Sequence, residues 1–270
     1  MEKVQRLVEE KIQGIPEDKD PVAILIGGLP GAGKTNLVKK IMEENPEKSF
    51  VVIDSDDFRK HTPNITELMK TTPQDAVNHS VMFANMVEKE LIKAAIDRGI
   101  SFISVTTLRA TDALNDLICI PARKKGFRFE IAAMVARIDE CLLATQMRYE
   151  EQIDKGQFPR YVTRDYMHLA YTGMLRSLDS FSKQMPIKLY KRGKGEDSLP
   201  VNVFDSTKNF AANMNMSAIY NMCTQRSLGE KEFLQAIQKL RMIKEGRNAD
   251  KLELDDLDDL EKAFDSDRQK

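Results

Sequence analysis

A glycine-rich stretch near the start of the chain constrains the fold more than any other feature. Residues 22–26 are apolar and partly β-branched, the segment 27–33 is rich in glycine, and Lys34 and Thr35 follow directly. Two of the glycines, the lysine and the threonine fill the fixed positions of the phosphate-loop pattern G-x-x-x-x-G-K-[ST]. The apolar run is typical of a buried parallel strand, and the residues after Thr35 repeat their apolar positions at helical spacing. The sequence therefore predicts a strand, a loop and a helix in that order.

This arrangement has a defined chemistry. Glycines let the backbone curl so that successive N–H groups point at phosphate oxygens, and the helix N-terminus adds a partial positive charge there. Lys34 can reach the β- and γ-phosphates, and the Thr35 hydroxyl can bind Mg²⁺. A turn that only joins a strand to a helix would need neither side chain. We expect the chain to bind a nucleoside triphosphate through Gly28, Leu29, Pro30, Gly31, Ala32, Gly33, Lys34 and Thr35.

Further apolar segments alternate with amphipathic ones and predict the rest of the fold. The segments expected to form strands are 50–53, 100–105, 127–135, 187–190 and 201–204. Helices are expected at 75–98, 113–125, 139–152 and 163–183, after an N-terminal helix with Val4, Leu7, Val8 and Ile12 on one face. Strands that alternate with helices imply a parallel sheet with right-handed crossovers. The expected fold class is α/β, with a parallel sheet of the P-loop NTPase type flanked by helices.

Composition and charge exclude several other classes of protein. The formal net charge of −1 gives no general attraction to nucleic acid or to an anionic membrane, so neither is an expected partner. Cys119, Cys141 and Cys223 lack metal-ligand spacing, and we expect them to be reduced and mostly buried. The N-terminal segment is charged and lacks the apolar core of a secretion signal, and no apolar run reaches transmembrane length. A cytoplasmic protein is therefore expected.

Acids and arginines after the phosphate loop favour a small kinase. No base-recognition signature of a GTPase is found, although Asp54 or Asp56 could serve as the strand-end acid of a motor or helicase ATPase. A kinase needs a base for the acceptor hydroxyl and cations for the transferring phosphoryl group. Asp56 is a candidate base, and Arg148 and Arg160 are candidate lid cations on either side of a segment interrupted by glycine and proline. Taken singly, Asp54 and Asp56 could instead cap a helix or form a turn, and Arg148 and Arg160 could form ordinary surface ion pairs.

Five blocks of sequence, in order and at similar spacing, resemble the zeta-toxin family of bacterial toxin–antitoxin systems. The pattern D-x-D-x-F-R, joined to T-x-R-x-T-D and R-Y-E, is more specific than the phosphate loop alone. The resemblance covers about residues 23–206. The blocks are Gly28–Thr35, Ile53–Arg59, Thr107–Asp112, Met147–Glu150, and Arg160 with Val162, Thr163 and His168.

The resemblance implies an enzyme that uses ATP and Mg²⁺ to phosphorylate the 3′-hydroxyl of the amino sugar in UDP-N-acetylglucosamine. It also implies a separate small helical antitoxin that blocks the ATP site. Lys34 and Thr35 would hold the phosphates and Mg²⁺, with Asp56 as the base. Arg148 and Arg160 would stabilise the transferring phosphoryl group. The residues that would line the substrate pocket are Arg59, Glu88, Thr107 and Arg109.

The chain departs from the family pattern at two places. Val105 stands where the family commonly has the glutamate of Glu-Gly-Thr, and the block from Arg160 to His168 is one residue longer. Valine cannot accept hydrogen bonds from a sugar or a uracil, so the identity of the phosphoryl acceptor stays open. Phosphoryl transfer itself is still expected. One alternative is a P-loop kinase of another acceptor, such as a nucleoside, a dinucleotide cofactor or an RNA end. The other is a non-catalytic nucleotide-binding partner protein whose acidic C-terminal helices make the contacts.

The chain changes character after the last expected strand. We expect a P-loop kinase domain of the zeta-toxin type at 1–207 and a helical, acidic C-terminal extension at 208–270. Within the extension, Leu252–Lys262 mixes leucines with acidic residues. This pattern fits a solvated acidic helix with a thin apolar stripe, partly frayed, or a docking surface for a basic partner. Charge runs usually form solvated faces, so the first interpretation is preferred.

Overall fold

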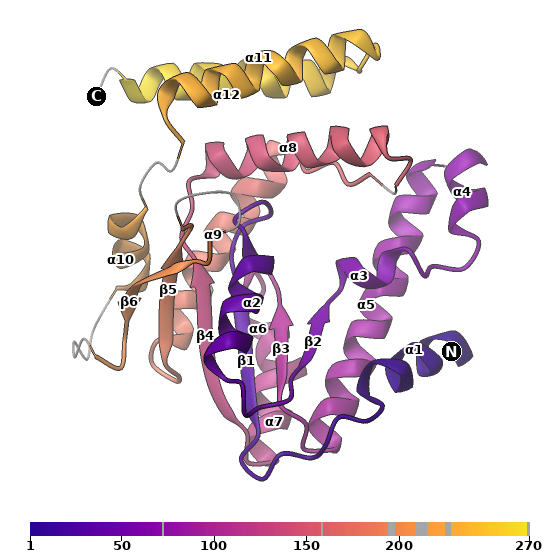
Figure 1. Ribbon diagram of the computed structural model, residues 1–270, viewed down its shortest axis with the longest axis vertical. Helices are drawn as coiled ribbons and strands as arrows, with labels where there is room; N and C mark the ends of the chain where they lie inside the picture. Colours follow the sequence, from indigo (N-terminus) through magenta and orange to yellow (C-terminus); the bar gives the residue numbers. More distant parts are fainter. Residues whose placement is uncertain (72, 158, 194–197, 209–214, 225–227, 269–270) are drawn as a thin grey trace.

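The computed structural model describes residues 1–71, 73–157, 159–193, 198–208, 215–224 and 228–268. A six-stranded sheet has the order β2-β3-β1-β4-β5-β6. Figure 1 shows helix α8 lying across the upper edge of this sheet, where the strand arrows point, with α11 and α12 above α8. The strands are β1 (Val22–Gly27), β2 (Val51–Asp54), β3 (Phe102–Val105), β4 (Arg128–Met134), β5 (Ile187–Lys191) and β6 (Val201–Asp205).

The helices agree with the predicted alternation of strands and helices. Helix α1, whose four predicted apolar residues are buried, packs on α5, and α2 packs on β1 and β4. The bounds of the first helices are α1 (Glu2–Ile12), α2 (Lys34–Glu44), α3 (Asp56–Arg59), α4 (Ile65–Thr71) and α5 (Pro73–Asp97). The middle ones are α6 (Thr111–Leu114), α7 (Ile120–Lys124), α8 (Ile138–Asp154) and α9 (Arg164–Phe181). The last three are α10 (Met216–Cys223), α11 (Glu230–Gly246) and α12 (Lys251–Arg268).

The prediction of a parallel sheet is confirmed for five strands and wrong for the last one. β1 pairs in parallel with β3 and β4, β2 pairs in parallel with β3, and β4 pairs in parallel with β5. β6 runs antiparallel to β5. The connection between them, 192–200, is shorter than the dozen or so residues that a parallel crossover needs. The sheet is therefore mixed, although mostly parallel.

The single helix expected at 113–125 is interrupted. Residues Asn115–Cys119 form a π-helical turn between α6 and α7. Pro121 follows within the first turn of α7, and its ring nitrogen cannot donate a hydrogen bond to the preceding turn. A wider turn at this point accommodates the missing donor without ending the helical path.

The acidic C-terminal helix has the apolar stripe of the preferred interpretation, and several of its acids are exposed, but the helix is packed over Lys251–Arg268 and the expected fraying is wrong. In α12, the side chains of Leu257, Leu260 and Phe264 are buried, and the Phe264 ring stacks on Phe233 of α11 with centroids 4.7 Å apart. Its acids bind cations of the same chain, as in the 2.7 Å contact between Arg241 Nη1 and Asp258 Oδ1. The basic partner of this helix is therefore supplied by its own chain. The expected boundary at 207/208 stays a prediction, and residues 209–214 lie outside the described residues.

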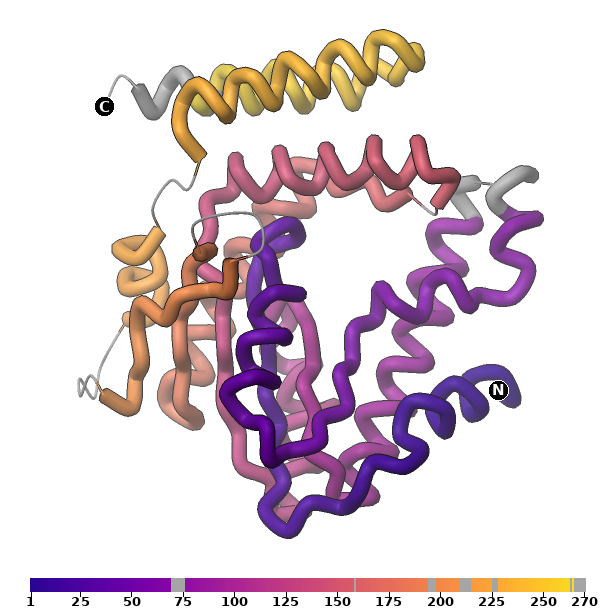
Figure 2. Tube along the Cα trace, viewed as in Figure 1, coloured from indigo at the N-terminus to yellow at the C-terminus, as the bar shows by residue number. Residues whose placement is uncertain are grey.

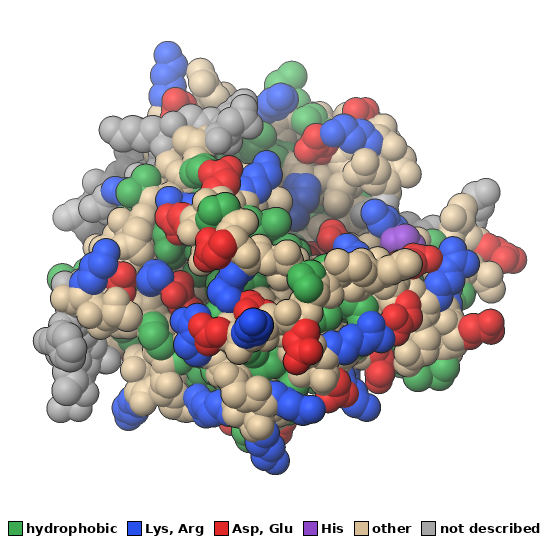
Figure 3. All heavy atoms as spheres, turned by 60° about the horizontal axis from the view of Figure 1, so that its bottom comes forward, with side chains coloured by type: hydrophobic (Ala, Val, Ile, Leu, Met, Phe, Trp, Pro, Cys, Tyr) green, Lys and Arg blue, Asp and Glu red, His purple; other side chains and the backbone are tan. Residues whose placement is uncertain are grey.

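The cysteines and the surface charge agree with the expectations from composition. Cys119 and Cys141 are buried, and Cys223 is half-buried. On the face in Figure 3, lysine and arginine side chains alternate with aspartate and glutamate, so this face offers no continuous basic surface. Within the described part of the chain, no helix combines the length and the apolar character needed to cross a bilayer.

Candidate active site

The phosphate loop lies between the buried strand β1 and helix α2, as the sequence predicts. Gly31 and Gly33 adopt positive φ angles of 78° and 96°, the left-handed region that favours glycine. A Cβ atom at Gly31 would lie 2.6 Å from the carbonyl oxygen of Cys141, in α8. Glycine at 31 therefore lets α8 pack directly against the loop. The arrangement leaves the N-terminus of α2 facing the space that the loop encloses.

Lys34 begins α2 and folds back over the loop. Its Nζ donates hydrogen bonds to the carbonyl oxygens of Gly28 (2.9 Å) and Leu29 (3.1 Å). Burial lowers the pKa of Lys34 to about 8, while the charges of Asp54 and Asp56 act in the opposite direction. The amine is thus held at the loop and lies within electrostatic reach of both acids. Thr35, next to it, is exposed at the start of the helix.

Asp56 and Arg160, far apart in the sequence, are in direct contact. Arg160 Nη1 donates a hydrogen bond to Asp56 Oδ2, and Arg59 Nη1 lies 3.8 Å from Asp56 Oδ1. The Asp56 backbone N–H donates to Asp54 Oδ1 at 3.0 Å. Burial, and then the charge of Asp56, raise the pKa of the Asp54 carboxyl above its ordinary value. The predicted base and one predicted lid cation therefore meet at the edge of the sheet beside the loop.

Two of the predicted substrate residues lie beside these acids. Arg59 is buried and donates from Nε and Nη2 to the hydroxyl of Ser80 in α5, at 3.2 and 3.1 Å. Glu88, two turns further along α5, has its pKa raised to about 7 by burial and by the charges of Asp54 and Asp56. Glu88 therefore lies within electrostatic reach of both acids, and its role in the substrate pocket stays a prediction.

The other predicted site residues are more loosely placed. Thr107 is half-buried after β3, and the exposed Arg109 packs its guanidinium 5.3 Å from the ring centroid of Tyr166. Arg148 is exposed on α8, one turn beyond Thr145, whose methyl group faces Gly31. Among the described residues Arg148 makes no hydrogen bond or ion pair. Its role as a lid cation stays a prediction.

One cation at the loop was missed from the sequence. Arg192, directly after β5, donates from Nη2 to the carbonyl oxygen of Gly31 and from Nε to that of Ala32 (3.3 Å). It was not among the predicted site residues. Its place at the carboxyl end of a parallel strand, where open α/β sheets bind their ligands, was the available signal.

The residues present fit a nucleotide with Mg²⁺. Lys34 donates hydrogen bonds to two carbonyl oxygens of the loop, and phosphate oxygens can accept these bonds in their place. Thr35 offers a hydroxyl, and Asp54 and Asp56 offer carboxylates. Such oxygen donors are the ones that Mg²⁺ prefers. Across the described residues, no group of three or more histidine, cysteine or acidic side chains is arranged to hold a metal ion.

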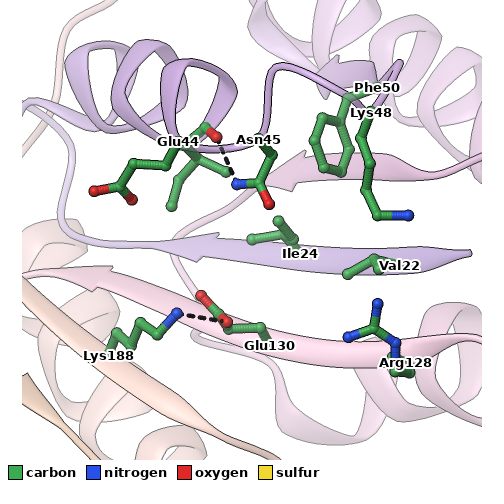
Figure 4. Close-up of a pocket in the computed structure, with 10 residues that line it drawn as sticks. Val22, Ile24, Glu44, Asn45, Lys48, Phe50, Arg128, Glu130 and Lys188 are labelled. Atoms are coloured by element: carbon green, nitrogen blue, oxygen red, sulfur yellow. Dashed lines mark hydrogen bonds and ion pairs between the residues drawn. The ribbon is translucent and has the colours of Figure 1, made fainter.

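A small pocket elsewhere on the sheet lacks this chemistry. Figure 4 shows it at the opposite end of β1 from the loop, with Val22 and Ile24 at its base. Its charged groups are already paired: Lys188 Nζ lies 2.8 Å from Glu130 Oε2, and Lys48 Nζ lies 2.6 Å from Asp18 Oδ2. The candidate site is therefore the loop and the acids beside it.

Comparison with known proteins identifies the family. The family model for zeta toxin matches residues 5–200. The chain belongs to the zeta-toxin family. Zeta toxins from Enterococcus hirae and Streptococcus pyogenes are 30% and 34% identical over 189 residues, which are 68% of this chain and 65% of each relative. The match thus spans a little less than two thirds of these relatives.

A third relative is similar over more of its length. The toxin PezT of Streptococcus pneumoniae is 26% identical over 233 residues, 84% of this chain and 88% of the relative. A solved structure from the PezAT toxin–antitoxin system of that organism has the same fold, with a TM-score of 0.72 and 24% identity over 90% of this chain and 95% of that one. The match to the zeta-toxin family model ends at residue 200, so α10, α11 and α12 lie outside the residues that this family model matches.

Proposed function

We propose that this zeta-toxin family member is an ATP-dependent phosphotransferase that moves the γ-phosphoryl group of ATP to a hydroxyl of a small molecule. The observation that carries the proposal is the contact between Asp56 and Arg160 beside the loop of Lys34. Such a reaction needs a proton acceptor and a cation next to bound phosphates. The chain brings these groups together from three distant segments, which surface ion pairing alone does not require.

The loop binds the nucleotide in this scheme. Lys34 exchanges its bonds to the carbonyl oxygens of Gly28 and Leu29 for bonds to the β- and γ-phosphates. Its pKa of about 8 leaves the amine mostly protonated at pH 7, and phosphates nearby favour the charged form further. Mg²⁺, held by the Thr35 hydroxyl together with the phosphates, would supply further neutralisation of their charge.

Asp56 and Arg160 act on the reacting atoms. The entering acceptor hydroxyl donates its hydrogen bond to Asp56 and displaces Arg160, which turns to the γ-phosphoryl oxygens. As the hydroxyl oxygen bonds to phosphorus, its proton passes to an Asp56 carboxylate oxygen, and the bond from phosphorus to the bridging oxygen of ADP breaks. Arg160, with Arg148 from α8, holds the charge that develops on the transferring group.

UDP-N-acetylglucosamine is the first acceptor to test, with phosphorylation at its 3′-hydroxyl. Arg59 and Glu88 offer a donor and an acceptor for a sugar nucleotide near Asp56, and Thr107 and Arg109 are proposed to complete this pocket. The alternative of another small acceptor stays open. Val105 ends β3 directly beside Asp54 of β2, and its apolar side chain cannot accept a hydrogen bond from a sugar there. The alternative of a non-catalytic partner protein loses support, because acids of α12 bind cations of this same chain.

The experiment follows phosphate from γ-labelled ATP into a panel of acceptors: UDP-N-acetylglucosamine, nucleosides, dinucleotide cofactors and RNA ends. Labelled product with UDP-N-acetylglucosamine, located at the 3′-hydroxyl by NMR, is the expected result. Transfer to another member of the panel would keep the phosphotransferase and replace the acceptor. Absence of transfer to every acceptor, with ATP bound, would contradict the proposed activity.

A protein partner is also proposed. The PezAT structure comes from a toxin–antitoxin system. We infer that this chain also has a small helical antitoxin, and that this partner covers the ATP site. Such a partner, co-expressed from a neighbouring reading frame, would compete with ATP for the protein. Titration of a fluorescent ATP analogue with and without the partner measures this competition, and unchanged ATP affinity would contradict it.

A further inference from the structure

A cluster of four charged side chains, three of them buried and Arg247 26% exposed, joins α8 to the two last helices. Glu150 of α8 lies 2.8 Å from Lys244 Nζ and 2.8 Å from Arg247 Nε, both on α11. Glu253 of α12 accepts from the same two cations. Lys244 is fully buried, and the side chains of Glu150 and Glu253 are 5% and 9% exposed. Two cations and two carboxylates thus balance one another inside the protein.

Two tyrosines connect this cluster to the segment that carries Arg160. Lys244 Nζ lies 5.3 Å from the ring centroid of Tyr149 and 5.5 Å from that of Tyr161, and the two rings meet edge to face with centroids 5.1 Å apart. The Tyr161 hydroxyl donates a hydrogen bond to Asp256 of α12. Three residues later Arg164 Nη1 lies 2.7 Å from Asp259 Oδ2 of the same helix. The segment after Arg160 is therefore fixed to the C-terminal helices at two points.

Arg160 itself is held from both sides. Its backbone N–H donates to Gln152 Oε1 of α8 at 3.0 Å, and its guanidinium donates to Asp56. The next residue is Tyr161, with the contacts given above. Figure 2 shows the α11–α12 pair lying along α8, on the side of α8 away from the sheet. A continuous path of contacts runs from Lys244 through Tyr161 to the guanidinium that contacts Asp56.

We propose that the α11–α12 pair positions Arg160 for catalysis, with Lys244, Tyr161 and Asp256 as positioning residues. The inference rests on the proposed role of Arg160. Gly156 and Pro159 interrupt the helical path before Arg160, so local helical hydrogen bonds do not fix its direction. The buried cluster and the tyrosine hydroxyl supply this constraint from the far side of α8. A cation that must meet a transferring phosphoryl group needs such support, because small displacements weaken transition-state contacts steeply.

If Lys244 only stabilised the C-terminal helices, its loss would have the same effect as the loss of another ion-pairing residue of α11. Arg241 provides this matched control. Arg241 lies on the same helix as Lys244, and among the described residues its ion pairs are with Asp258 and Glu261 of α12. Arg241→Gln therefore removes ion pairs between α11 and α12 and leaves the side chains of the path to Arg160 unchanged. Tyr171→Phe, which removes a hydroxyl bonded to Asn221, is the matched control for Tyr161→Phe.

The first experiment needs no catalysis. Hydrogen–deuterium exchange of the full chain is measured for the wild type, Lys244→Met and Arg241→Gln. Lys244→Met is expected to raise exchange at residues 159–163 several-fold, whereas Arg241→Gln raises it only within α11 and α12. Equal exchange at 159–163 in all three proteins overturns the proposal. If Lys244→Met does not fold, the same comparison is made with Tyr161→Phe and Tyr171→Phe.

The second experiment is a double-mutant cycle on phosphoryl transfer from ATP, using UDP-N-acetylglucosamine or the acceptor found in the panel. Tyr161→Phe is expected to lower kcat roughly tenfold with little change in the KM for ATP, within the hundredfold that about 1 Å of misplacement can produce. In an Arg160→Ala protein the same change is expected to have no further effect, because its target is absent. Equal effects in both backgrounds overturn the proposal. If the wild type transfers no phosphate, the proposed function fails, while the exchange experiment still decides whether the helices hold the segment.

Discussion

At the residue scale, the lysine of the loop is the group whose loss is easiest to interpret. Lys34 makes bonds to loop carbonyls that bound phosphates would replace. Lys34→Ala removes a cation aimed at the β- and γ-phosphates, so we expect transfer to fall by roughly 10²-fold or more with the fold intact. Phosphate transfer and circular dichroism measure the two quantities. Unchanged turnover in a folded variant would contradict the phosphate-loop assignment.

The base is tested by replacing either of the two acids at the end of β2. Asp56→Asn keeps the size of the side chain but cannot take a proton, so transfer is expected to fall roughly 10²-fold or more while ATP affinity changes little. Asp54→Asn is the matched comparison. The Asp54 carboxylate accepts a hydrogen bond from the Asp56 backbone N–H, whereas the Asp56 carboxylate accepts one from the Arg160 guanidinium. Turnover and ATP binding are measured for both. Full activity in Asp56→Asn with loss in Asp54→Asn would move the base to Asp54.

Glu88 gives the protein a pH dependence that its position explains. The unfolded chain releases this proton near pH 4.5 and the folded chain near pH 7, because burial and the charges of Asp54 and Asp56 disfavour the carboxylate. The folded state therefore binds more protons in this window, and the free energy of unfolding falls as pH rises from about 4.5 to 7, by roughly 2–3 kcal/mol for this group. Glu88→Gln is expected to remove that part of the slope in urea unfolding between pH 5 and 8. Glu90→Gln on the same helix should keep it, and equal slopes in all three proteins would count against the raised pKa.

At the scale of elements, α8 links the loop to the lid. Its first turns pack on Gly31, its middle carries Arg148, and its end holds the backbone of Arg160 through Gln152. If both arginines act mainly in the transition state, Arg148→Ala and Arg160→Ala should each lower kcat by roughly 10²-fold and change the KM for ATP far less. Steady-state kinetics with ATP varied separate the two constants. An effect confined to KM would assign these arginines to nucleotide binding alone.

At the scale of the whole molecule, the parts expected as domain and extension share one interior. Tyr220 of α10 is buried, and its hydroxyl accepts from the Ala136 N–H at 3.2 Å; Phe233 and Leu240 of α11 are buried as well. We expect 1–207 and 208–270 to unfold in a single cooperative transition, because their core contacts and the Glu150–Lys244 pair cross the boundary. Differential scanning calorimetry measures this. Two separate transitions would instead support an independent C-terminal domain.

The sequence by itself determined the strand, loop and helix around Lys34 and the alternation that builds the sheet. These features depend on local patterns: apolar runs form buried strands, and glycines permit the curled loop. It also placed Asp56 just after a strand end and indicated Arg148 and Arg160 as candidate lid cations, to which the family resemblance assigned the same role. The break at Pro121 and the antiparallel β6 were also within reach, from the missing N–H donor and the short connection.

Only the tertiary structure decided which distant residues meet. The contact of Asp56 with Arg160, the Arg192 bonds to the loop carbonyls, and the burial of Lys244 between Glu150 and Glu253 join segments whose spacing along the chain carries no periodic signal. The acidic run of α12 shows the reason most clearly. A carboxylate on a helix has the same local pattern whether it faces water or a buried cation, and the packing of the α11–α12 pair along α8 decides between the two.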